Sequence, residues 1–396
     1  MLADLTSLRL GGPARRLVDV STEADLLDAV RTADAAGEPL LVLAGGSNLV
    51  VADEGFDGTV VHVVTRGVDV RASDADGGSA TRAGAAATDA AAADAAATDA
   101  GAATDTGAAV ATKAGAGATT RTRRGTGDGR PGGRGRTVDV TVAAGEPWDG
   151  LVERAVAEGW SGIEALSGIP GSTGATPIQN VGAYGQEVAE TIVELRAWDR
   201  RTGEVRTIPA ADCGFGYRTS AFKGHDRYVV LDVTFRLSLD RAGAPIRYAE
   251  LARRLDTDPG TTAPAAEVRQ AVLGLRSGKG MVLDAADHDT WSAGSFFTNP
   301  VLDPSEVPEG APTWPQPYGR VKTSAAWLID HAGFGKGHPG PGGRVALSTK
   351  HPLALTNRGG ASTADLLALA REVRDGVRSR FGVDLVNEPT LVGCTL

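Results

Sequence analysis

Apolar residues along this chain recur with two different periods. A period of about 3.6 residues, as over 22–36, predicts amphipathic helices, and short alternating or continuous apolar runs predict strands. Ser21 or Thr22 would cap the first helix and Gly37 would end it. The patterns predict helices at 22–36, 148–158, 324–331 and 364–381, and strands at 40–43, 59–64, 138–143, 191–199, 204–208, 228–239 and 385–391, with two more near Val345 and Leu353. This mixture predicts an α+β protein with two or three lobes.

The apolar pattern stops between residues 71 and 136. This segment consists mainly of Ala, Asp, Thr and Gly, becomes rich in Arg and Gly at its end, and has Val110 as its only branched aliphatic residue. Such a composition cannot bury enough apolar surface to offset the entropy of ordering the chain. We therefore expect a low-complexity, disordered insertion.

The segment 168–187 departs from both periods in another way. It reads GIPGSTGATPIQNVGAYGQE, with five glycines, two prolines and a single charge at its end. Glycine and proline disfavour a helix, and glycines let backbone N–H groups approach an anionic ligand closely. A second turn of this kind, Gly45–Asn48, follows the short strand at 40–43. The residues alone leave two interpretations open, a phosphate-binding backbone or an ordinary surface loop.

Bulk composition narrows the possible partners. Hydrophobic residues make up 42% of the chain, which is enough for a sizeable core, and the net charge is −9. This charge argues against broad binding to nucleic acid or to an anionic membrane. The two cysteines, Cys213 and Cys394, lie far apart, and there is no apolar signal or long apolar run. We expect a cytoplasmic, monomeric protein without membrane insertion.

Several short motifs match known sites by letter only. Residues 335–340 read GKGHPG, but a proline interrupts this dinucleotide-type pattern and the segment lies among loops. Residues 278–280 read GKG, which is too short for a phosphate-binding loop of the nucleotide-hydrolase type. The six histidines show no metal-ligand spacing, so we expect no metal site.

Three further residues are candidates for chemistry. Ser295 stands before two phenylalanines in SAGSFFTNP, where it is either a buried structural hydroxyl or a proton donor. A serine is a competent acid only toward a strongly basic carbanion, with cations nearby to stabilise the developing charge. Arg218 offers such a cation, and Glu388 stands at a predicted strand end where a carboxylate can point into a site.

Taken together, these segments resemble one family, the UDP-N-acetylenolpyruvoylglucosamine reductases, over nearly the whole chain except 71–136. Several ordered motifs at compatible spacing make the resemblance specific. They are TSLRLGGPA at 6–14, AGGSN at 44–48, IPGSTGATPIQNVGAYGQE at 169–187, FGYR at 215–218, AGSFF at 293–297, AAWLID at 325–330 and NEP at 387–389.

The resemblance implies an α+β architecture with an FAD-binding fold of the vanillyl-alcohol-oxidase type in two lobes and a C-terminal α+β substrate-binding domain. Residues 1–70 would form the first lobe together with a C-terminal strand at 389–396. Residues 137–281 would form the second lobe and 282–388 the substrate domain, with the insertion between the lobes at 71–136.

The resemblance also implies the chemistry. NADPH would reduce non-covalently bound FAD, and flavin N5 would pass hydride to C3 of UDP-N-acetylglucosamine enolpyruvate, giving UDP-N-acetylmuramate for peptidoglycan. Ser295 would protonate C2, while Arg218 and Glu388 hold the substrate carboxylate. Tyr248, Lys279 and Asn299 match substrate contacts. FAD contacts would come from Gly45, Gly46, Ser47, Asn48, Pro170, Gly171, Ser172, Gly174, Asn180, Gly182, Ala183 and Gly185.

The chain departs from the family pattern at two places, the insertion and His331. The family often has glutamine after the residues WLID, where this chain has His331, so we predict His331 as a fourth substrate residue. Two alternative functions stay open: a related FAD-dependent oxidase of a sugar or phenol, and a UDP-sugar-binding module without catalysis.

Overall fold

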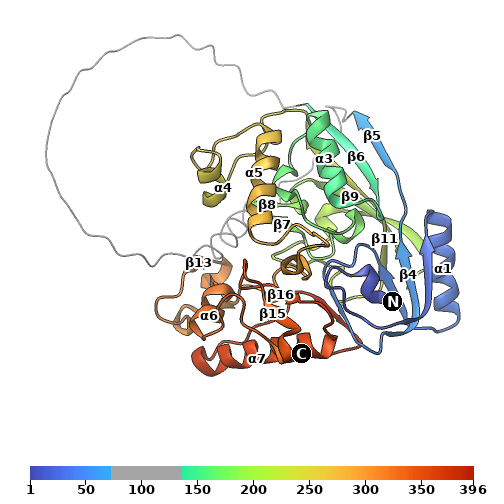
Figure 1. Ribbon diagram of the computed structural model, residues 1–396. Helices are drawn as coiled ribbons and strands as arrows, with labels where there is room; N and C mark the ends of the chain where they lie inside the picture. The colour runs from blue at the N-terminus through green and yellow to red at the C-terminus, as the bar shows by residue number, and fades with distance from the viewer. Residues whose placement is uncertain (73–135) are drawn as a thin grey trace, which may run out of the picture.

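A computed structural model describes residues 1–72 and 136–396 (Figure 1). The disorder predicted for 71–136 therefore falls almost entirely outside the described residues. Within them, Figure 1 shows blue N-terminal elements beside a green antiparallel sheet, yellow helices next to that sheet, and a separate group of orange-red C-terminal elements. Helices and strands are intermixed, which confirms the predicted α+β class.

The N-terminal sheet is parallel and has three strands. β1 (Ala14–Val20) and β2 (Leu40–Leu43) flank β4 (Phe56–Val63). Parallel strands of one sheet need a crossover connection, and α1 (Glu23–Ala35) provides it between β1 and β2, which lie on either side of β4. The Thr22 hydroxyl accepts a hydrogen bond from Asp25 N, which confirms the predicted cap.

The second sheet is antiparallel, in the order β10-β9-β11-β6-β5. Its strands are β5 (Val68–Ala72), β6 (Thr137–Ala143), β9 (Ile192–Asp199), β10 (Glu204–Pro209) and β11 (Tyr228–Ser238). The predicted boundary at residues 70 and 71 falls inside β5, in which Ala72 pairs with Val138, and the division into lobes stays a prediction. β5 is an exposed edge strand, so it carries no apolar run that would have marked it in the sequence.

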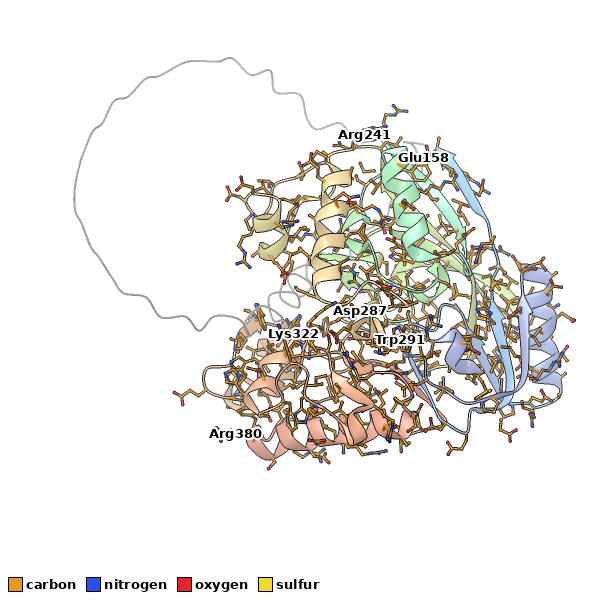
Figure 2. The ribbon with its side chains drawn as sticks, in the orientation of Figure 1. Glu158, Arg241, Asp287, Trp291, Lys322 and Arg380 are labelled. Atoms are coloured by element: carbon orange, nitrogen blue, oxygen red, sulfur yellow. The ribbon has the colours of Figure 1, made fainter. Side chains whose placement is uncertain are left out.

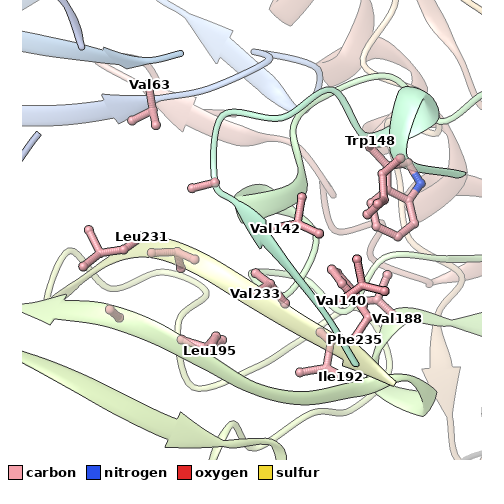
Figure 3. Close-up of a cluster of buried hydrophobic side chains, with 14 of the residues drawn as sticks. Val63, Val140, Val142, Trp148, Val188, Ile192, Leu195, Leu231, Val233 and Phe235 are labelled. Carbon is pink, nitrogen blue, oxygen red and sulfur yellow. The ribbon is translucent and has the colours of Figure 1, made fainter. Parts of the chain in front are cut away.

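One hydrophobic core joins the two sheets. Val63 of β4, Val142 of β6 and Trp148 of α3 (Trp148–Glu158) belong to the same buried cluster, part of which Figure 3 shows. The helix α3 has the predicted bounds, and Pro147 is its N-cap. Gly159 ends the helix in the left-handed conformation that glycine adopts without a steric penalty.

Two helices in the middle of the chain are absent from our predictions. They are α4 (Ala249–Arg254) and α5 (Ala265–Gly278), which pack together with Tyr184 and Tyr248 in a smaller core. The prolines of this region suggested loops. However, Val268, Ala271 and Val272 are buried on one face of α5, and their spacing is a helical signal that we did not use.

The C-terminal part packs α6 (Ala325–His331) and α7 (Thr363–Phe381) with small antiparallel sheets. Leu8 and Leu10 from the N-terminal segment are buried in the same core. The sheets contain β12 (Val301–Leu302), β13 (Thr313–Pro315), β14 (Val321–Thr323), β15 (Val345–Leu347) and β16 (Leu355–Asn357).

The last predicted strand is largely wrong. Instead of 385–391, the strand is β17 (Thr390–Val392), which pairs in parallel with β3 (Leu49–Val51). Pro389 has no backbone N–H to donate to a ladder, so regular pairing starts after it. Glu388 therefore lies just before a strand rather than at its end.

Short elements connect the larger ones. The hairpin of β7 (Gly182–Ala183) and β8 (Gln186–Glu187) lies inside the glycine-rich segment. Single-turn 3₁₀ helices occur at Leu2–Leu5, Glu164–Leu166, Thr173–Ala175, Val188–Glu190, Ala210–Asp212, His288–Thr290, Pro304–Glu306, Pro317–Gly319 and Pro341–Gly343. Across the described ranges, no helix is both long and apolar enough to cross a membrane.

Candidate functional site

The two glycine-rich turns predicted to bind a phosphate touch each other. A Cβ atom added to Gly45 would lie 2.4 Å from Gly171 Cα, and one added to Gly171 would lie 2.8 Å from Ser47 Oγ. Gly46 has a positive φ of 54°, and a Cβ there would lie 1.8 Å from Leu5 O. The backbones approach so closely that these positions have no room for side chains.

The peptide groups of both turns have a defined direction. Ser7 donates hydrogen bonds to Gly46 O from its N–H and to Ser47 O from its Oγ, both at 3.2 Å. Because the carbonyl and the following N–H of a trans peptide point in opposite directions, the N–H groups of Ser47 and Asn48 point away from Ser7. Trp148 N donates to Gly171 O at 3.0 Å, so the next N–H points away from α3. This arrangement fits an anion such as a pyrophosphate.

The later part of the glycine-rich segment has a different role in the fold. It forms the β7–β8 hairpin, whose two turn residues, Tyr184 and Gly185, both have positive φ, 49° and 83°. Such a turn matches the twist of a tight antiparallel hairpin. Buried Asn180 precedes the hairpin and donates through Nδ2 to Glu187 Oε2 at 2.7 Å.

Arg218 lies against this hairpin. Its Nη2 donates to Gly182 O at 2.8 Å, and its Nη1 lies 3.9 Å from Glu187 Oε1. Its Nε lies 3.8 Å from Glu388 Oε1, although the two residues are 170 positions apart in sequence. Its side chain is only 13% exposed, so these charges interact in a partly desolvated environment.

Glu388 connects this cluster to the first glycine-rich turn. Gln179 Nε2 donates to Glu388 Oε1 at 3.4 Å, and Asn48 Nδ2 donates to Gln179 Oε1 at 2.7 Å. Thr390 N donates to Asn48 O at 3.0 Å as β17 begins. The predicted FAD residue Asn48 and the predicted catalytic residue Glu388 are therefore linked through Gln179.

Ser295 lies on the segment next to Glu388. Phe296 O accepts a hydrogen bond from Glu388 N at 2.8 Å, and Phe297 forms a β-bridge with Asn387. Both phenylalanine rings are buried at 1% exposure, whereas Ser295 is only partly buried. The Ser295 Oγ lies 3.5 Å from His351 Nε2.

A second group of predicted residues gathers beside the hairpin. Lys279, at the end of α5, forms an ion pair with Glu250 Oε2 at 2.6 Å and lies 5.9 Å above the Tyr184 ring. The rings of Tyr184 and Tyr248 are 5.4 Å apart. Burial raises the pKa of the Tyr184 phenol to about 12, so it remains a neutral donor.

Asn299 and His331 lie at opposite ends of α6. The side-chain Oδ1 of Asn299 accepts from Ala325 N at 2.9 Å, at the first turn of the helix. His331 is half-exposed at the last turn, where its ring stacks on Trp327 at 3.9 Å and Nδ1 lies 2.9 Å from Trp327 O. The helix separates them by roughly 9 Å, at 1.5 Å per residue. The structure therefore does not bring His331 to Asn299.

Several polar residues of this region were not among our predictions. Lys322 on β14 is buried and lies 4.4 Å above the ring of Tyr217, next to Arg218 in sequence. Figure 2 shows Lys322 at the junction between the orange-red C-terminal elements and the rest of the molecule. A lysine in the sequence VKTS has no local pattern that distinguishes it from a surface lysine.

Lys223 is a further cation beside Arg218. Its Nζ donates to Arg218 O at 2.9 Å. Burial lowers the pKa of the Lys223 ammonium. The charge of Glu388 raises this pKa, and the charge of Arg218 lowers it further. Its position five residues after Arg218 places it near Arg218 in the sequence, but the loop must fold to bring the ammonium to the Arg218 carbonyl.

The described residues contain no cluster of His, Cys, Asp or Glu that could hold a metal ion.

Both halves of the chain resemble known protein families. Residues 286–392 match the model of the UDP-N-acetylenolpyruvoylglucosamine reductase C-terminal domain, and residues 14–131 and 134–209 match an FAD-binding domain. These matches support the predicted FAD-binding fold. They include Asn48, Gln179 and Glu388, whereas Arg218 lies between the two matched parts.

Individual relatives match over the full chain. The UDP-N-acetylenolpyruvoylglucosamine reductase of Salinispora arenicola is 52% identical, covering 100% of this chain and 95% of the relative. That of Cutibacterium acnes is 50% identical, covering 100% of this chain and 90% of the relative. The crystal structure of UDP-N-acetylenolpyruvylglucosamine reductase from Thermus caldophilus has a similar fold, with a TM-score of 0.57 at 23% identity over 99% of this chain and 97% of that one.

Proposed function

The chain belongs to the UDP-N-acetylenolpyruvoylglucosamine reductase family, and from this premise we propose that it reduces the enolpyruvyl group of UDP-N-acetylglucosamine enolpyruvate with electrons from NADPH. The product would be UDP-N-acetylmuramate, a precursor of peptidoglycan. The observation that carries the proposal is the convergence of Arg218, Glu388 and the Ser295 segment, which come from three distant parts of the sequence.

The touching turns Gly45–Asn48 and Pro170–Gly174 would hold the FAD pyrophosphate through backbone N–H groups. Asn180, Gly182, Ala183 and Gly185 lie in or next to the hairpin, so they would shape the site between cofactor and substrate rather than line the pyrophosphate. When bound, FAD supplies two-electron chemistry, from NADPH to C3 of the enolpyruvyl group through its N5 atom.

Arg218 and Glu388 would hold and polarise the substrate carboxylate. Hydride addition at C3 leaves negative charge at C2 that spreads into this carboxylate, and the Arg218 guanidinium would stabilise it. The Ser295 Oγ–H bond then breaks while a C2–H bond forms, and the serine oxygen recovers a proton from solvent. A serine acid suits this step because the carbanion is strongly basic.

Lys279 and Tyr248 would bind the nucleotide part of the substrate, and Asn299 would be a further substrate contact. Lys279 carries a charge suited to a diphosphate, and Glu250, its ion-pair partner, holds the ammonium beside the two tyrosine rings. His331 stacks on Trp327 at the far end of α6, and we do not assign it to the substrate site.

NADPH oxidation, followed with and without UDP-N-acetylglucosamine enolpyruvate, tests the proposal. We expect the purified protein to carry FAD and to oxidise NADPH rapidly only when the substrate is present, whether or not oxygen is removed. Turnover that requires oxygen and is indifferent to this substrate would instead indicate a flavin oxidase. A protein without flavin absorbance and without turnover would indicate a binding module.

A further inference from the structure

His351 lies beside Ser295 but has no role in the chemistry described so far. Its side chain is almost completely buried, with 4% of the residue exposed. Its Nε2 lies 3.5 Å from Ser295 Oγ, at the outer limit of a hydrogen bond. Catalytic hydrogen bonds are often long before substrate binds and shorten in the complex.

The loop that carries His351 is held by its own hydrogen bonds. Ser348 Oγ accepts from Lys350 N at 3.1 Å and from His351 N at 3.2 Å. Ala354 N donates to His351 O at 3.1 Å, and Ser348 N donates to Ala354 O at 2.8 Å. These bonds close the turn on both sides of the imidazole.

The same loop is joined to both flanks of Ser295. Before Ser295, Asp289 accepts from Thr349 N at 3.0 Å, and Asp287 Oδ2 forms an ion pair with Lys350 Nζ at 2.5 Å. After Ser295, Phe296 N donates to Leu353 O at 2.7 Å. The separation between His351 and Ser295 is therefore set by the fold on both sides.

The proposed reaction fixes which way a hydrogen bond between these side chains must run. If the Ser295 proton is to reach substrate C2, its Oγ–H must point toward the substrate rather than toward the imidazole. The oxygen can then only accept from His351, whose Nε2 can carry a proton. As the serine proton leaves, the oxygen becomes negative, and a hydrogen bond to a charged oxygen is stronger than one to a neutral hydroxyl.

We propose that His351 is a positioning residue for Ser295: its Nε2–H donates to Ser295 Oγ, directs the serine proton to the substrate and stabilises the oxyanion that the proton leaves behind. This inference rests on the proposed function of Ser295. It requires no change in the redox balance, because the transferred proton comes from Ser295 and is replaced from water.

The test uses the FAD-loaded protein under anaerobic conditions in a stopped-flow spectrometer. Flavin reduction by NADPH and flavin reoxidation by UDP-N-acetylglucosamine enolpyruvate are measured separately. The variants are His351→Leu, which removes the donor, His351→Gln, which retains one, Ser295→Ala, and the double variant Ser295→Ala/His351→Leu. His338→Leu is the matched control, because His338 pairs with Glu372 on the surface of the C-terminal part.

We expect His351→Leu to slow flavin reoxidation by substrate about 10- to 100-fold, the effect of losing a hydrogen bond to a charged group. His351→Gln should stay within about fivefold of the wild type, since an amide still donates. In the Ser295→Ala background, His351→Leu should cause no further loss. Flavin reduction by NADPH should be unchanged in all variants and in the control.

Three results would overturn the inference while leaving the proposed function intact. The first is normal reoxidation in His351→Leu. The second is an equal loss from His351→Leu with and without Ser295, which indicates a general structural effect, and the third is a glutamine variant as slow as Ser295→Ala. If His351→Leu does not retain FAD, His351→Met replaces it. A wild-type flavin that the substrate cannot reoxidise removes the proposed function and the inference together.

Discussion

At the scale of residues, Arg218 is held by its backbone as well as by its side chain. Its φ is 50°, a left-handed conformation that costs a non-glycine residue of order 1 kcal/mol or more. The Lys223 ammonium donates to its carbonyl, and the guanidinium contacts Gly182, Glu187 and Glu388. The strained backbone therefore directs the arginine toward the hairpin and Glu388.

This arrangement predicts the effect of Lys223→Met. The substitution keeps the length of the side chain but removes its hydrogen bond to Arg218 O and a positive charge near Glu388. We expect kcat/KM for the enolpyruvyl substrate to fall about tenfold, corresponding to one hydrogen bond, with flavin reduction by NADPH unaffected. Lys336→Met, on the loop after α6, is the matched control. Equal kinetics in the two variants would contradict a role in positioning Arg218.

Ser295→Ala tests the proton donor itself. We expect NADPH to reduce the flavin at nearly the normal rate, since this step needs no proton from Ser295. Reoxidation by the substrate should slow by about two to four orders of magnitude, the usual contribution of a positioned acid. Rapid-mixing absorbance measurements separate the two steps. A normal rate of reoxidation would show that another group donates the proton.

The sequence indicated some of these residues and not others for a physical reason. Arg218, Ser295 and Glu388 stand in recognisable motifs, so family resemblance identified them as candidates. Gln179 and Lys223 act through contacts that exist only after folding, with Glu388 and with Arg218 O respectively. His331 was predicted from its position after WLID; its ring stacks on Trp327, and its contact with the substrate stays a prediction.

At the scale of elements, the hairpin β7–β8 contacts both Arg218 and the proposed substrate residue Tyr248. Its turn requires positive φ at Tyr184 and Gly185, and a Cβ at Gly185 would lie 2.9 Å from Arg247 Cβ. Through Gly182 O and Glu187, the same hairpin orients Arg218. A change in its turn should therefore reach the catalytic groups.

Gly185→Ala should lower kcat/KM about tenfold or more and reduce the free energy of unfolding by about 1–2 kcal/mol, because it adds a steric clash to backbone strain. Gly260→Ala is the matched control: its φ is 92°, but an added Cβ would have open space around it. We expect this control to lose stability without losing activity. Steady-state kinetics and chemical denaturation measure both effects. An equal loss of activity in the two variants would argue against a specific role for the hairpin.

The N-terminus of α7 predicts a pH dependence of stability. Ser362 and Asp365 form a capping box, and the Arg344 guanidinium binds the Asp365 carboxylate at 2.6 and 2.9 Å, holding its pKa well below the usual range. A carboxyl with a lower pKa in the folded state stabilises the fold above its unfolded pKa of about 3.9, and that contribution is lost as the pH falls toward the folded value.

Asp365→Asn should therefore destabilise the protein most at pH 6 and progressively less as the pH is lowered to 3. Urea unfolding of both proteins at several pH values measures the difference. Asp384→Asn, whose carboxylate is exposed beside Arg378, is the control and should show a smaller difference. A destabilisation by Asp365→Asn that is the same at pH 3 and pH 6 would contradict the assigned ion pair.

Regular elements were predictable where local pattern and burial agree. α3 and β2 have the predicted bounds, since each has an apolar pattern that tertiary packing uses. β5 is exposed and lacks such a pattern, and β17 is shortened by Pro389. The hairpin β7–β8 has no apolar signal because its bounds depend on turn geometry and on contacts with Arg218 and Arg247.

At the scale of the whole molecule, distant parts of the chain combine to form the C-terminal core and the cluster around Glu388. Leu8 and Leu10 lie in the C-terminal core, and β17 pairs with β3 of the N-terminal part. The cluster around Glu388 draws on Asn48, Gln179 and Arg218. The burial of Leu8 and Leu10 in the C-terminal core and the pairing of β17 with β3 cross the predicted boundaries. The division into 1–70, 137–281 and 282–388 stays a prediction.

The position of the insertion gives a prediction for the whole chain. β5 and β6 are antiparallel neighbours, and Ala72 pairs with Val138, so their ends are close enough for a short turn. Replacing 73–135 with Asn-Gly leaves four residues between the paired Ala72 and Val138, a length common in hairpin loops, and should preserve FAD binding and change kcat/KM by less than about twofold. Flavin absorbance and steady-state kinetics check this. Loss of FAD from an otherwise folded variant would show that the segment contributes to the cofactor site.

In the proposed reaction, this molecule passes electrons from NADPH to an enolpyruvyl double bond. The most direct test reduces the flavin anaerobically with one equivalent of NADPH and then adds UDP-N-acetylglucosamine enolpyruvate. We predict that flavin absorbance returns in a single turnover and that the product is heavier than the substrate by two hydrogens, one each at C2 and C3. Flavin that stays reduced until oxygen is admitted, with the substrate recovered unchanged, would contradict the account.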